Sequence, residues 1–157
     1  MTLRVKATDN NIKVQIKRIL VPIDGSGYSF NAAKYAIKLA KDENAQLYCI
    51  HVMSSVPYGY ESSPHAIDQY FRDLEQKVQS WFDKIKDMAK NECISDLNTE
   101  TFTDVNSVIE SIIDYAVTKE VDLIVIGTRG SVANGVVQRD NALGQVPTIR
   151  IIFSHWY

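Results

Sequence analysis

Two short turns in this sequence carry residue types that can bind a nucleotide. In the first turn, Asp24 follows an apolar run over residues 19–23 and is itself followed by Gly25 and Ser26. A carboxylate at the end of a strand can accept hydrogen bonds from a ribose or a base. The same residue can equally well cap the helix that follows the turn. The residues around Asp24 support both roles, so both stay open.

The second turn, Gly127-Thr128-Arg129-Gly130-Ser131, has the composition of a phosphate loop. Glycines let a backbone approach a phosphate closely, and a helix that begins near Ser131 would direct N–H groups and a positive dipole end toward it. A tight strand-to-helix turn also uses glycine, and neither a GxGxxG fingerprint nor a GxxxxGK[ST] loop occurs. Arg129 can pair with a phosphate or remain solvated.

Strands and helices alternate along the chain around these turns. Short apolar runs predict strands at residues 19–23, 46–52 and 121–126, and shorter strands are expected at 99–102 and 147–153. Helical spacing predicts helices at 28–41, 67–89, 105–116 and 131–138. Ser26 or Ser29 is expected to cap the first of these helices, and Asp104 the third. The expected buried face of the third helix comprises Val105, Val108, Ile109, Ile112 and Ala116.

This alternation predicts an α/β fold in one domain. Helices of ten or more residues between strands act as crossover connections, so the strands form a Rossmann-like parallel sheet with helices on both faces. Ligands bind such sheets at the carboxyl ends of the strands, where both turns lie. The domain covers residues 15–157, and the polar residues 1–14 are expected to form a flexible arm.

Composition excludes several classes of function. Of the 157 residues, 45% are hydrophobic and the net charge is −2, which argues against a protein that coats nucleic acid or an anionic membrane. The cysteines and histidines show no metal-ligand spacing, and Cys49 lies in an apolar run typical of a buried residue. With no apolar leader and no membrane-length run, we expect a cytoplasmic protein.

Four segments together, LVPIDGS, YAIKLAK, QLYCIHV and DLIVIGTRG, resemble the universal stress protein family over about Lys17 to Val137. The resemblance implies a doubly wound five-stranded sheet of order 3-2-1-4-5. It also implies ATP binding in many members and none in others. By this resemblance Pro22, Ile23 and Asp24 would meet the adenosine and Val52 would lie against the base. Ile126 and Gly127 would begin the ribose and phosphate loop, followed by Arg129 and Gly130, and then by Ser131 and Val132 at the start of the last helix.

The phosphate side departs from the family pattern. ATP-binding members carry a glycine, two residues, a glycine, nine residues, and then a glycine followed by Ser or Thr; here that last pair falls on Asp140 and Asn141. The simplest interpretation is that the intervening loop is missing and that Gly130 serves twice. Each lost backbone contact to a phosphate would cost about 1–3 kcal/mol, and Asp140 would repel a triphosphate.

The C-terminal strand, from Thr148 to Phe153, suggests a homodimer. In the family this strand pairs across a two-fold axis, and an apolar strand edge here invites such pairing. The alternative is a strand that ends its own sheet with a frayed aromatic tail.

Three functions follow from these features. The first is a stress-response regulatory module that binds ATP, and the second is a nucleotide-free dimer that acts through a protein partner. The third, a nucleotide hydrolase, is the least supported, because no nucleophile and base lie together in the sequence, and any ATP hydrolysis should be slow.

Overall fold

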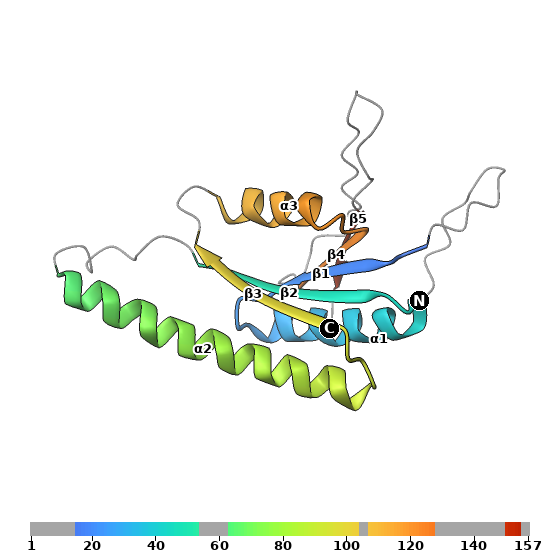
Figure 1. Ribbon diagram of the computed structural model, residues 1–157, viewed down its shortest axis with the longest axis horizontal. Helices are drawn as coiled ribbons and strands as arrows, with labels where there is room; N and C mark the ends of the chain where they lie inside the picture. Colours follow the sequence, from blue (N-terminus) through green and yellow to red (C-terminus); the bar gives the residue numbers. More distant parts are fainter. Residues whose placement is uncertain (1–14, 54–62, 104–106, 128–149, 155–157) are drawn as a thin grey trace, which may run out of the picture.

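A computed structural model describes residues 15–53, 63–103, 107–127 and 150–154 of the chain (Figure 1). They form one five-stranded sheet of order β3-β2-β1-β4-β5, and every neighbouring pair of strands is parallel. In chain order the elements are β1 (Arg18–Pro22), α1 (Gly27–Glu43), β2 (Gln46–Met53), α2 (Pro64–Asn91), β3 (Leu97–Thr103), α3 (Val108–Thr118), β4 (Leu123–Gly127) and β5 (Arg150–Ser154). The predicted α/β class and strand order are confirmed. The expected N-terminal arm and the expected helix at 131–138 lie outside the described residues.

The helices cover both faces of the sheet. Figure 1 shows α1 and α2 on one face and α3 on the opposite face. Parallel strands are joined almost always by right-handed crossovers. The chain steps one way from β1 through β2 to β3 and returns from β3 to β4, so the connecting helices must change face at that point.

Two apolar clusters form the core, one on each face. On the α1 and α2 face, alanines of α1 at positions 32, 33, 36 and 40 allow that helix to pack closely against Ile19, Val21 and Leu47. On the α3 face, Leu20, Ile50 and Ile124 pack around Ala116. Cys49 is fully buried, and its burial raises the thiol pKa to about 12. Cys49 is therefore the buried, protonated residue that its apolar run predicts.

Serine caps begin each of the three helices that the structure describes. The Ser26 hydroxyl accepts the Ser29 N–H at 3.1 Å, which confirms one of the two predicted caps for α1. Ser63 caps α2, which therefore begins at Pro64, three residues earlier than its apolar stripe predicts. Proline suits this first helical position because its missing N–H would have no partner inside the helix.

The prediction for the third helix is wrong in two respects. Its N-cap is Ser107 rather than Asp104, and Val108 and Ile109 are 39% and 70% exposed rather than buried. The reason is position along α3. Ile109 and Ala116 are seven residues apart and share one face of the helix. Tyr115 stacks on Phe102 of β3 with ring centroids 5.7 Å apart, and Ala116 packs in the cluster beside it, whereas Ile109 in the first turn is not part of that cluster.

Candidate nucleotide crevice

The sheet opens between β1 and β4 at its carboxyl edge. These two strands pair only at Ile19–Leu123 and Leu20–Ile124. On their other sides, β1 stays paired with β2 as far as Pro22, and β4 stays paired with β5 as far as Gly127. The ends of β1 and β4 therefore extend past their common ladder. This is also where the strand order reverses, which is the position at which ligands enter open α/β sheets.

The apolar candidate residues divide between the two faces of the sheet. Val52 and Ile126 belong to the cluster on the α3 face, together with Leu20 of β1. Side chains alternate along a strand, so Pro22 shares this face with Leu20. The structure thus brings Pro22, Val52 and Ile126 to one side of the crevice.

Ile23 lies on the other face and is already engaged by the fold. Its side chain is 2% exposed and packs in the cluster under α1 and α2. Its N–H donates to the carbonyl of Ile50 at 2.8 Å, and its carbonyl accepts from His51 Nδ1 at 2.6 Å. A carbonyl can only accept, so Nδ1 carries the proton in this contact. Ile23 therefore anchors the end of β1 to β2.

Asp24 is exposed at the rim of the crevice and shapes the turn before α1. Its Oδ1 accepts the Ser26 N–H at 2.9 Å, while Ser26, not Asp24, caps the helix. Partial burial acts to raise the pKa of Asp24, but hydrogen bonds from Ser26 and Ser29 outweigh it and hold the pKa below its usual value. The carboxylate is thus ionised at neutral pH, as an acceptor for hydroxyl or amino hydrogens must be.

Trp81 of α2 and His51 of β2 support this turn. Gly25 has a φ of +79°, and the Trp81 ring fills the space in which a Cβ on Gly25 would stand. The His51 ring meets Trp81 edge to face, with centroids 5.4 Å apart. The aromatic stripe of α2 explains Trp81 as a core residue, so no signal in the sequence ties it to the turn. The sequence gives one weak indication that His51 lies near the site, which is its position next to Val52 at the end of a predicted strand.

Gly127 meets the first turn of α1. A Cβ built on Gly127 would overlap the backbone carbonyl of Tyr28. The close approach of β4 to α1 therefore requires glycine here, whether or not a phosphate is bound. The remaining phosphate candidates, Arg129, Gly130, Ser131 and Val132, lie outside the described residues.

The described ranges contain neither a cluster of metal ligands nor a helix that could cross a membrane. In residues 15–53, 63–103, 107–127 and 150–154, no group of three or more His, Cys, Asp or Glu side chains could hold a metal ion. Within the same ranges, no helix is both long enough and apolar enough to cross a membrane.

Known proteins resemble this chain in sequence and in fold. The model of the universal stress protein family matches residues 15–146. Universal stress protein MJ0531 of Methanocaldococcus jannaschii is 33% identical over 114 residues, and the match spans 73% of this chain but only 65% of the length of that relative. A family member from Burkholderia pseudomallei has a solved structure with a TM-score of 0.59 and 25% identity, covering 73% of this chain and 83% of that one. A universal stress protein in complex with cAMP has the same fold, with a TM-score of 0.51, 18% identity, and coverage of 71% of this chain and 72% of that one. The chain belongs to the universal stress protein family.

Proposed function

We propose that this chain is a stress-response regulatory module that binds an adenine nucleotide, ATP in particular, in the crevice between β1 and β4. The observation that carries the proposal is the parting of these strands beyond Leu20 and Ile124, with an ionised carboxylate at the rim. The cAMP complex of a protein with the same fold supports an adenine nucleotide as the ligand class.

The residues around the crevice could contact the base, the ribose and the phosphates of a nucleotide. Val52 and Ile126, with Pro22 beside them, offer apolar contact to a base, since they share the α3 face. Asp24 accepts hydrogen bonds from ribose hydroxyls, each worth about 1.5–3 kcal/mol because the acceptor is charged. Arg129, Gly130 and Ser131 remain the candidates for the phosphates.

Trp81 supplies an intrinsic probe for the binding experiment. Its ring lies against Gly25, next to Asp24, so a ligand at the rim should change its fluorescence. The variant Trp156→Phe removes the second tryptophan of the chain from the signal. Titration with MgATP and with cAMP should then give a saturable change in Trp81 fluorescence. Isothermal calorimetry of the same titrations should give a saturable heat of binding.

The Asp24→Asn variant tests the role of the carboxylate. We expect it to weaken binding about 10- to 100-fold, the equivalent of one charged hydrogen bond. Asp114→Asn serves as the control, because Asp114 is exposed on α3. Absence of heat and of a fluorescence change at several millimolar MgATP and cAMP would exclude the proposal.

We propose that the chain binds its nucleotide without acting as an enzyme on it. We also propose that it does so in the cytoplasm. The Ser26 hydroxyl, next to Asp24 in this turn, accepts the Ser29 N–H as the cap of α1. Steady phosphate release that is lost in Asp24→Ala would instead indicate a hydrolase.

A nucleotide-free dimer acting through a protein partner is the second candidate. It is favoured by the position of β5, which is the last strand of the sheet and pairs on one side with β4. An edge strand of this kind can pair with its equivalent in a second copy. Sedimentation of the full chain at increasing concentration tests the dimer, and a single monomeric species throughout would exclude it. Nucleotide that co-purifies with the chain would exclude the nucleotide-free form.

A further inference from the structure

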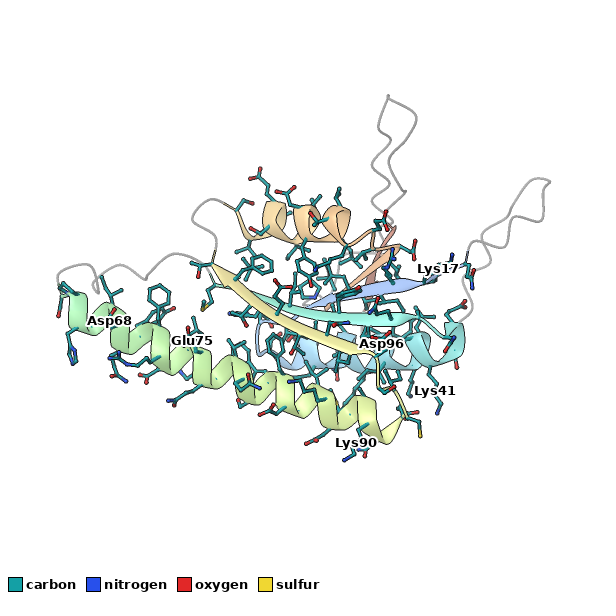
Figure 2. The ribbon with its side chains drawn as sticks, viewed as in Figure 1. Lys17, Lys41, Asp68, Glu75, Lys90 and Asp96 are labelled. Atoms are coloured by element: carbon teal, nitrogen blue, oxygen red, sulfur yellow. The ribbon has the colours of Figure 1, made fainter. Side chains whose placement is uncertain are left out.

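A groove with a volume of about 560 Å³ runs between α1 and α2, on the outer side of the sheet's first face. Ile37 and Met88 line its apolar part, together with the half-exposed ring of Tyr35. The lining residues of α2 lie near its C-terminal end, whereas the nucleotide crevice lies near the N-terminus of α1. Figure 2 labels Lys41 and Lys90 at the groove end of the two helices and Asp68 at the far end of α2. The groove is therefore separate from the crevice.

Side-chain contacts link α1 with the α2 segment at both ends of the groove. Toward the start of α1, Lys84 of α2 places its ammonium 4.2 Å from the ring centroid of Phe30. Toward the end of α1, Lys41 forms an ion pair with Glu92 at 2.9 Å. These contacts join α1 and α2 at both ends of the groove, which is present without a bound ligand.

The wall that α1 contributes carries unbalanced positive charge. Lys34 and Lys38 line the groove one helical turn apart, and both are exposed. Neither side chain makes a hydrogen bond or an ion pair with any residue that the structure describes, although the pKa of Glu92 is lowered by its hydrogen bond from Lys41 and, to a smaller extent, by the charge of Lys38. Glu92, the carboxylate that lines the groove, accepts its hydrogen bond from Lys41 instead. Like charges at this spacing on a helix repel each other, and a bound anion would remove that repulsion.

We propose that this groove binds a small organic anion with an apolar body, such as an aliphatic or aromatic carboxylate or a phosphate monoester. The charged end lies between Lys34 and Lys38, and the apolar body lies against Met88 and the half-exposed ring of Tyr35, above the buried Ile37. The amide side chains of Asn31 and Asn91, which also line the groove, supply further hydrogen bonds. The volume falls within the range of small-molecule sites, and a flexible methionine adapts to apolar groups of differing shape. This inference does not depend on nucleotide binding.

The fluorescent sulfonate 8-anilinonaphthalene-1-sulfonate has the required chemistry and serves as the probe. We expect saturable fluorescence enhancement with the folded full-length chain, which saturating MgATP leaves unchanged. Decanoate should displace the probe, whereas decanol, which has the same chain length without the charge, should displace it at least tenfold less well.

Charge reversal on α1 provides the matched test. The double variant Lys34→Glu, Lys38→Glu should weaken probe binding at least tenfold, while Lys86→Glu, an exposed lysine of α2 that does not line the groove, should leave it unchanged. Circular dichroism of each variant verifies that the fold is retained. Equal affinity in the two variants, equal displacement by decanol and decanoate, or displacement by MgATP would each overturn the proposal.

Discussion

Substitution of Gly25 by alanine should destabilise the fold through its contact with Trp81. The positive φ of Gly25 makes any side chain there strained, at about 1–2 kcal/mol. The new Cβ would also overlap the six-membered ring of Trp81, and forcing that ring aside adds about 1–3 kcal/mol. Gly25→Ala should therefore lower the free energy of unfolding by about 2–5 kcal/mol.

The two causes can be separated by a double-mutant cycle with Trp81→Leu. The smaller leucine makes room for the Cβ, so Gly25→Ala in that background should cost only the backbone strain of about 1–2 kcal/mol. Urea unfolding followed by far-ultraviolet circular dichroism measures all four proteins without relying on tryptophan. Gly27→Ala is the matched control, since nothing lies within 4 Å of its Cβ. It should be neutral or slightly stabilising, because alanine favours helices.

The reasoning fails if Gly25→Ala is as stable as the parent. It fails equally if Trp81→Leu leaves the cost of Gly25→Ala unchanged, because the ring would then not be the obstacle.

Three further predictions follow from the structure. Gly127→Ala should lower the free energy of unfolding by at least about 3 kcal/mol in a thermal or urea melt, because its Cβ would meet the backbone of Tyr28, which cannot rotate away. The lowered pKa of Asp24 means that its ionised form contributes stability at pH values above its unfolded pKa, and that this contribution is lost as pH falls through the folded pKa. The stability difference between the parent and Asp24→Asn should accordingly shrink between pH 7 and pH 3, and a constant difference would contradict the hydrogen bonds described. Cys93 is exposed and Cys49 is buried, so Ellman's reagent should titrate one thiol in the native chain, none in Cys93→Ser, and two in the denatured parent.

The fold could be predicted to the extent that its signals are local. The run at residues 19–23 is apolar throughout, and only a strand covered on both faces accounts for it. The exposure of Ile109 could not be predicted in this way. Ile109 and Ala116 fit the same apolar face of α3, and which part of that face is covered depends on where the helix lies along the sheet, with Tyr115 against Phe102 of a different element.

The candidate site shows the same division between local and distant signals. Asp24 and its turn are visible in the sequence because strand, carboxylate and glycine are adjacent. Trp81 comes from a helix that is remote in the chain, and its contact with Gly25 exists only once α2 has packed against the sheet.

Neither glycine of the crevice is therefore a sign of phosphate binding. Gly127 is required by the backbone of Tyr28, and Gly25 is required by its positive φ and by the ring of Trp81. A glycine that the fold itself demands gives no support to a phosphate site. The case for a nucleotide rests instead on the parted strands and on Asp24, whose ionised carboxylate is exposed at the rim while it also accepts a hydrogen bond from the turn. Because Ser26, His51 and Trp81 already hold this turn, a ligand would find the carboxylate in place and lose little entropy in ordering it.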